Sequence, residues 1–314
     1  MSAEESPKAV IAALAANLGI AATKVLAWVL TGSASMLAEA IHSFADSGNQ
    51  GLLLLGRSRS RRAPTSEHPF GYARERYIYA FLVSIVLFSV GGLFALYEAS
   101  HKYQEVHGGS PNELLESRWR WVPLVVLVAA ICMESFSLRT AVSESNRTRG
   151  GATWVQFVRR AKSPELPVVL LEDVAALVGL VLALAGVGLT LLTRNGYWDV
   201  AGTTGIGLLL VTVAVVLGIE TKSLLLGEAA ALDDQDAIAD AISGPGSLGL
   251  RIIHLRTLQL GPGSVLVACK IAVAPDDRAA DLAAAIDAAE VRVRAAVPDA
   301  TYVFIEPDVR RADA

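Results

Sequence analysis

The chain has 314 residues, of which 53% are apolar and 18% charged, and its net charge is -4 at pH 7. Soluble domains usually carry about a quarter charged residues, so this composition argues against an ordinary soluble protein, and the slight acidity gives no sign of nucleic-acid binding. The start, MSAEESPK, is acidic and lacks the basic start of a cleaved signal peptide, so we expect the first apolar segment to remain in the mature protein. Cys132 and Cys269 lie far apart in the sequence, and we expect two structural thiols without a disulfide.

Six apolar segments are long enough to cross a bilayer, which takes about 20 residues. They cover residues 9–31, 35–56, 77–97, 121–142, 167–192 and 198–218. The first, second and fifth are interrupted by polar residues, whereas the third and much of the sixth read as ordinary lipid-compatible helix. The pattern predicts an α-helical membrane domain of six spans over residues 1–227.

The distribution of basic residues predicts how these spans are oriented. Arginine and lysine gather in the loops after the second and fourth spans, at 57–76 and 139–162, and are sparse in the other short loops. Basic loops stay on the cytoplasmic side. We therefore expect a multi-pass integral membrane protein with both termini in the cytoplasm, in the plasma (inner) membrane if the source is bacterial.

The character of the chain changes at about residue 228. The pattern predicts a helix with an acidic first turn, two strands of alternating polarity, an amphipathic helix and a last strand, over 232–243, 250–261, 264–273, 278–297 and 300–309. This order favours a small antiparallel sheet with helices on one face, in a cytoplasmic α/β domain over 228–314. A domain of this size has a small core, so we expect it to dimerise.

Ionisable residues inside the spans are the strongest functional signal, because burying a charge in a bilayer costs about 2.5–3.5 kcal/mol or more. His42 and Asp46 lie four residues apart, on one face of a helix. Glu172 and Asp173 of the fifth span are taken as the only other deep carboxylates. Imidazole and carboxylate groups suit a divalent first-row metal. Neighbouring residues point about 100° apart on a helix, so one of Glu172 and Asp173 is expected to bind the ion and the other to support it.

The remaining polar residues of the spans have alternative interpretations. Glu39 either lines a vestibule or is exposed near the end of its helix. Asn17, Lys24 and Asn49 are interpreted as interhelical hydrogen-bonding residues rather than ligands. A purely structural contact between helices is also an alternative for the pair formed by His42 and Asp46.

Several motifs together resemble the cation diffusion facilitator family of the zinc-transporter type. They are HSFAD at 42–46, EDVAALVG at 172–179 and the stretch EHPFGYARERYIYAFLVSIVLFSVGGLFALYEASHK at 67–102. The last stretch resembles the mitochondrial-type zinc transporter branch and its bacterial relatives especially. The resemblance covers residues 8–307, and it implies a ferredoxin-like C-terminal domain and a homodimer.

The resemblance also implies a tetrahedral transport site, with two ligands each from the second and fifth spans. His42, Asp46 and Asp173 match this pattern, but Val169 stands where the family has a histidine or aspartate. The fourth ligand is then Glu172, water or nothing. Loss of one imidazole leaves manganese, iron and cobalt open beside zinc, which the branch resemblance favours.

Two other histidines bear on further metal sites. His68 matches one position of a loop site found in the family, but Tyr72 stands where a second histidine is common, so a structural loop with a turn at HPFGY is favoured. His254 is interpreted as a sheet-surface residue, so a metal-sensing C-terminal domain is doubtful.

The resulting hypothesis is a secondary transporter that exports a divalent metal, zinc first, from the cytoplasm in exchange for protons, by alternating access. No enzyme activity and no cofactor are expected, since the ion is the cargo; its partners are the metal, protons, the lipid bilayer and a second copy of the chain. The alternatives are a non-transporting membrane scaffold or metal sensor, a transporter selective for manganese, iron or cobalt, and an intramembrane metalloenzyme with Glu172 as its general base.

Overall fold

The computed structural model describes residues 7–244 and 250–309. It divides into two compact units that are considered separately. A helical unit comprises Met1–Gly56, Tyr79–Arg159 and Pro164–Glu220, and a second unit comprises Arg57–Ile78, Arg160–Ser163 and Thr221–Ala314.

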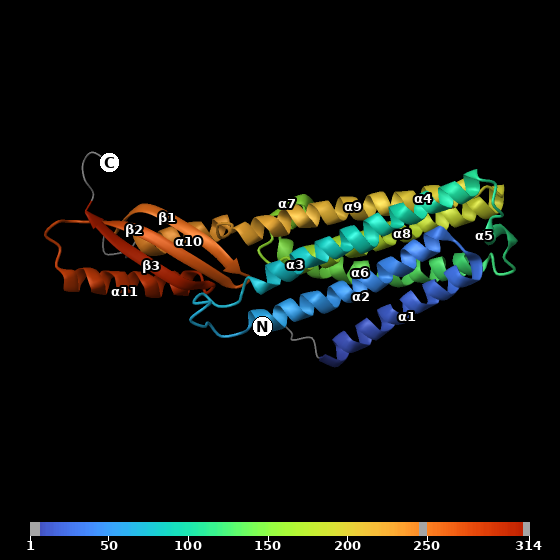
Figure 1. Ribbon diagram of the computed structural model, residues 1–314. Helices are drawn as coiled ribbons and strands as arrows, with labels where there is room; N and C mark the ends of the chain where they lie inside the picture. Colours follow the sequence, from blue (N-terminus) through green and yellow to red (C-terminus); the bar gives the residue numbers. More distant parts are fainter. Residues whose placement is uncertain (1–6, 245–249, 310–314) are drawn as a thin grey trace. The chain divides into compact units, whose positions relative to one another are not determined.

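Each of the six predicted apolar segments lies in a long helix, and these helices run alongside one another in the helical unit (Figure 1). They are α1 (Pro7–Thr31), α2 (Ala34–Ser60), the continuous α3 (Glu75–Val86), η1 (Leu87–Leu93) and α4 (Phe94–His107), then α6 (Val122–Arg149), α8 (Glu165–Thr193) and α9 (Tyr197–Leu226). The π-helical segment η1 interrupts the third without breaking it. Two short helices, α5 (Glu113–Glu116) and α7 (Trp154–Arg160), were not predicted.

Four helices within the described residues are long and apolar enough to cross a membrane, and the chain is an integral membrane protein. They are Glu75–His107, α6, α8 and α9. In α1 the structure describes the side chains from Asn17 onward, and this part, Asn17–Thr31, is a shorter apolar helix. The helix α2 has 27 residues, but its polar residues lower its hydropathy below that of a typical span.

Glycines let some of the long helices approach closely. A Cβ atom on Gly202 of α9 would lie 2.9 Å from the backbone oxygen of Leu182 in α8, and one on Gly92 of η1 would lie 2.7 Å from Val211 Cγ2 in α9. A larger residue would therefore push these helices apart.

The second unit contains α10 (Leu232–Ser243), β1 (Arg251–Gly261), β2 (Ser264–Val273), α11 (Ala279–Ala296) and β3 (Ala300–Val309). The strand order is β1-β2-β3, with β1 and β2 antiparallel but β2 and β3 parallel. The prediction of an antiparallel sheet was therefore wrong for β3. Because α11 carries the chain back between β2 and β3, the two strands run in the same direction.

One face of this sheet forms the core of the second unit. Val265, Val267, Cys269 and Ile271 alternate inward along β2 and pack against buried residues of α10 and α11. Both helices therefore cover the same face, as predicted. His254 lies exposed on β1, as its interpretation as a surface residue requires.

The predicted turn at HPFGY is present in the same unit. Gly71 N donates to His68 O at 2.9 Å, and the His68 ring stacks on Tyr72 with 4.6 Å between ring centroids. Gly71 has a φ of 77°, which a residue with a side chain rarely adopts.

Candidate metal site

The face of α2 that carries His42 and Asp46 is buried in the helical unit. The His42 side chain is 1% exposed, and its Nδ1 lies 3.4 Å from Asp46 Oδ1, one helical turn away. This distance allows an ion pair, but the contact does not have the geometry of a hydrogen bond. Within the described residues neither ring nitrogen of His42 has a hydrogen-bond partner. A buried imidazole without hydrogen bonds keeps its ring nitrogens free to bind a ligand.

Asp46 opens onto a cavity of about 110 Å³ between four helices. It is lined by polar and apolar side chains of α1, α2, α6 and α8: Asn17, Ile20, Ser43, Asp46, Gln50, Met133, Glu134, Ser137, Val169, Glu172, Asp173 and Ala176. Three of the four predicted ligands, Asp46, Glu172 and Asp173, thus share one cavity. The fourth, His42, does not line it, but contacts Asp46.

Hydrogen bonds hold the two carboxylates of α8 in place. Asn49 Nδ2 of α2 donates to Glu172 Oε1 at 2.7 Å, and Ser137 Oγ of α6 donates to Asp173 Oδ2 at 3.0 Å. Glu172 is 5% exposed. These bonds fix α8 to α2 and α6 at the level of the cavity. They also confirm the interpretation of Asn49 as an interhelical hydrogen-bonding residue.

The same interpretation holds for Asn17 and Lys24. Asn17 Nδ2 of α1 donates to Gln50 Oε1 of α2 at 3.3 Å. The Lys24 ammonium, 1% exposed, donates to Glu39 Oε2 at 3.0 Å and to Ser43 Oγ at 2.7 Å. Glu39 is fully buried, so the alternative that placed it in solvent was wrong. Its environment is set by a lysine from another helix, which the periodicity of α2 alone does not reveal.

Glu134 is a site residue that the sequence reasoning missed. It lies on α6 and lines the cavity together with Ser137, three residues further on. Glu172 and Asp173 are therefore not the only other deep carboxylates. A single glutamate in the apolar run of α6 has no partner at the spacing of a ligand pair, although its i,i+3 relation to Ser137 was a usable signal.

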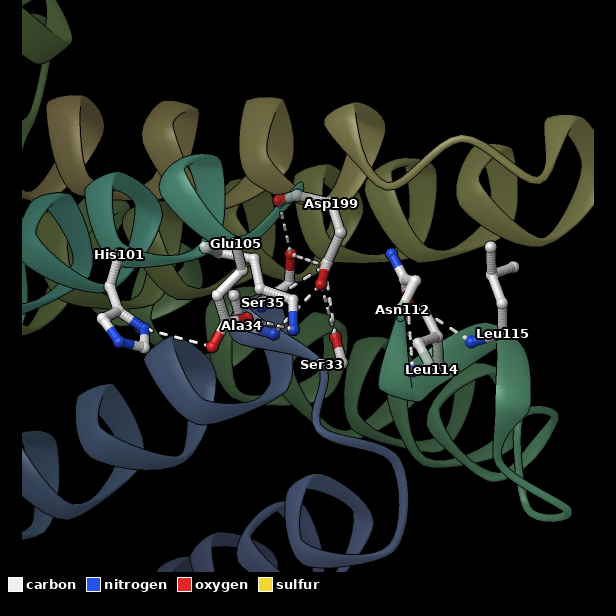
Figure 2. A network of polar contacts seen from close by, with 10 residues as sticks. Ser33, Ala34, Ser35, His101, Glu105, Asn112, Leu114, Leu115 and Asp199 are labelled. Atoms are coloured by element: carbon white, nitrogen blue, oxygen red, sulfur yellow. Dashed lines mark hydrogen bonds and ion pairs between the residues drawn. The ribbon is translucent and has the colours of Figure 1, made fainter. Parts of the chain in front are cut away.

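The N-terminus of α2 is stabilised by a residue of α9. Figure 2 shows the Asp199 carboxylate among Ser33, Ala34 and Ser35. It accepts from the backbone nitrogens of Ala34 at 3.0 Å and of Ser35 at 3.3 Å, and from both serine hydroxyls. Asp199 thus acts as an N-cap supplied by a different helix.

The donor set of the cavity fits a divalent cation in composition. It combines carboxylate oxygens with a neighbouring imidazole, a combination found in sites for zinc and other first-row metals. A cavity of about 110 Å³ also has room for an ion with several waters. In the described parts of the chain, however, no three His, Cys, Asp or Glu side chains are gathered closely enough to hold a metal. The groups therefore surround one space without forming a closed coordination shell.

Residues 10–226 match the family model described as the cation efflux transmembrane domain. The chain belongs to the cation efflux (cation diffusion facilitator) family. This match covers more than half of the chain and includes α2, α6 and α8. Membership confirms the resemblance that the sequence motifs indicated.

Curated relatives agree with this assignment. The chain is 34% identical over 245 residues to the mouse (Mus musculus) protein named proton-coupled zinc antiporter SLC30A9, mitochondrial, which covers 77% of this chain and 41% of the relative. It is 32% identical to metal tolerance protein C4 of Arabidopsis thaliana, over 74% and 49% of the two chains. It is 28% identical to the cation-efflux pump FieF of Pectobacterium atrosepticum, over 81% and 77%.

The chain thus spans about two fifths of the length of the mouse relative, 41%. The family model and the names of the mouse and Pectobacterium relatives describe transporters rather than enzymes, as the sequence predicts.

Proposed function

We propose that the chain is a secondary transporter that exports a divalent metal ion, zinc first, from the cytoplasm in exchange for protons. The observation that carries this proposal is the convergence of Asp46, Glu172 and Asp173 on one cavity among membrane helices, with His42 behind Asp46. Family membership supports the transport of a cation, and the name of the mouse relative supports zinc and proton coupling.

The mechanism follows from the chemistry of the ligands. Imidazole and carboxylate bind a metal only when deprotonated, so protons and metal compete for His42, Asp46 and Asp173. Protons that arrive from the far side release the ion there, and their loss to the cytoplasm prepares the site again. The ligand atoms must draw together around the ion, which alternating access provides when α2 and α8 shift relative to each other.

The proposal includes the topology predicted from the sequence. The domain boundary lies at 227/228, all six long helices cross the membrane, and both termini are cytoplasmic. The C-terminal domain is ferredoxin-like and forms a homodimer. The polar residues of α2 explain why its hydropathy is low for a span, since the site itself supplies them. The membrane is the plasma (inner) membrane if the source is bacterial, whereas the mouse relative is named as mitochondrial.

Flux through reconstituted protein tests the proposal. Full-length chain in proteoliposomes containing a zinc-sensitive dye is given an inward or outward pH gradient, and zinc entry is followed. The wild type should move zinc only with a proton gradient, and Asp46→Ala and Asp173→Ala should abolish this movement. The exposed Asp236→Ala in α10 is the matched control and should transport normally. Unchanged flux in both cavity variants would refute the assigned site.

A second function has two observations in its favour. Val169 lines the cavity where the family resemblance implies a ligand, and no closed ligand shell is formed among the described residues. A non-transporting scaffold or sensor would tolerate both features. It predicts no gradient-driven flux of zinc, manganese, iron or cobalt by the wild type, so the same assay with a panel of ions distinguishes the two.

A further inference from the structure

The cavity has a wall on α6 whose polar groups the proposed transport site does not use. Glu134 and Ser137 project from one face of this helix, because they are three residues apart, and both line the cavity. Ser137 Oγ donates to Asp173 Oδ2 at 3.0 Å. That bond holds the face of α6 that carries Glu134 against α8, beside a predicted ligand.

Glu134 differs from the other carboxylate of uncertain role, Glu172. Glu172 Oε1 accepts a hydrogen bond of 2.7 Å from Asn49 and is almost fully buried. No hydrogen bond or ion pair of the Glu134 carboxylate is found in the described part of the chain. The buried ammonium of Lys24 is bound to Glu39 and to Ser43. Both oxygens of Glu134 are therefore available to a ligand in the cavity.

The charges around the cavity favour a cation as the ligand of Glu134. Glu134 lies in the field of Lys24, whose ammonium is already bound to Glu39 and Ser43, and of the like-charged Asp46 and Asp173. Like charges in a region of low dielectric constant repel one another, and a divalent cation among them reverses the sign of the interaction. Val169 of α8, which also lines the cavity, offers no ligand atom.

We propose that Glu134 is a ligand of the transported divalent cation and takes the place in the ligand set that Val169 leaves vacant. This inference rests on the proposed transport function and adds α6 to the two helices that the family resemblance implies. The resulting set, His42, Asp46, Asp173 and Glu134, has one imidazole and three carboxylates. Such an oxygen-rich set discriminates less strongly against manganese than a set with two imidazoles.

A thiolate at position 134 tests contact with the ion directly. In a Cys132→Ser/Cys269→Ser background, Glu134→Cys is purified as the full chain, loaded with zinc and studied by X-ray absorption at the zinc edge. A zinc–sulfur distance is about 2.3 Å, longer than the about 2.0–2.2 Å of nitrogen and oxygen ligands. We expect one sulfur neighbour in Glu134→Cys and none in Glu98→Cys, a control at a partly buried glutamate of α4 outside the cavity lining. Zinc bound without a sulfur neighbour in Glu134→Cys would overturn the inference.

Affinity provides a second measurement that does not depend on the cysteine variant folding. By calorimetric titration with zinc, Glu134→Gln should bind at least ten times more weakly than the wild type, and Glu134→Asp should fall between them. Glu98→Gln should bind as the wild type does. Wild-type affinity in Glu134→Gln would overturn the role of Glu134 and leave the transport proposal intact. A wild-type chain that neither binds nor transports any of the four metals would instead overturn the proposed function itself.

Discussion

The cap that Asp199 provides to α2 allows a quantitative prediction. Its carboxylate, 1% exposed, accepts two backbone N–H groups at the start of α2 and the hydroxyls of Ser33 and Ser35 (Figure 2). Loss of an N-cap acceptor costs about 0.5–2 kcal/mol, and each buried donor left unsatisfied costs about 1–3 kcal/mol. The two serine hydroxyls can rotate to other partners, such as Thr203 Oγ1 for Ser35, so the two amides dominate. At about 1–3 kcal/mol for each of the two amides, Asp199→Ala should lower the free energy of unfolding by about 2–6 kcal/mol.

The assay is reversible unfolding of the full chain in mixed micelles, by detergent titration followed by circular dichroism. Asp199→Asn keeps one acceptor oxygen but loses the charge, so it should lose about half as much stability as Asp199→Ala. The exposed Asp236→Ala should change stability by less than about 0.5 kcal/mol. Asp46 lies 12 residues beyond Ala34, roughly 18 Å along the helix axis, so zinc affinity of the folded variant should be unchanged. A loss below about 0.5 kcal/mol in Asp199→Ala would refute the idea that α9 stabilises the start of α2.

Three further predictions concern other parts of the chain. Lys24→Met leaves the buried Glu39 without its cation, so it should destabilise the chain by about 3–5 kcal/mol in the same unfolding assay. The double variant Lys24→Met/Glu39→Gln should recover most of this loss. Equal losses in the single and double variants would contradict the pairing. Val169→His adds an imidazole to the cavity wall, so competition with a chromophoric chelator should show at least tenfold tighter zinc binding but little change for manganese. An unchanged ratio of zinc affinity to manganese affinity would mean that this side chain does not reach the ion. Burial raises the pKa of the Cys269 thiol to about 11, so at pH 8 a maleimide should label Cys269 of the Cys132→Ser variant slowly until the chain is unfolded, as read by mass spectrometry. Equal labelling rates before and after unfolding would contradict its burial.

The sequence predicted the helices and strands well, because their signals are local. Long apolar runs marked the six long helices, and alternating polarity marked β1 and β2. The starts of β1, β2 and β3 were all predicted to within a residue. The parallel pairing of β3 with β2 was available from the same pattern, since a helix between two strands returns the chain to its starting edge. The prediction was wrong because it did not take into account that α11 connects β2 to β3.

Only some residues of the candidate site could be predicted from the sequence. Those recognisable within one helix were found, and those that depend on contacts between helices were not. His42 and Asp46 share a helix face, so their spacing reveals them, and Asp173 matches a family motif. The role of Glu39 depends on Lys24, and the position of Glu134 depends on how α6 packs against α8. Contacts between helices carry no signal in the periodicity of one helix, so these two carboxylates needed the structure.

The costs of burial along α2 support a transport role over a purely structural one. Most polar groups of this helix have a partner from another helix: the first amides have Asp199, Glu39 has Lys24, and Asn49 has Glu172. His42 is different, because both of its buried nitrogens lack a hydrogen bond within the described residues. A residue whose role was to join helices would have such a bond, since leaving it unmade costs about 1–3 kcal/mol. An imidazole with free nitrogens beside a cavity lined by carboxylates is instead suited to a site that binds and releases an ion.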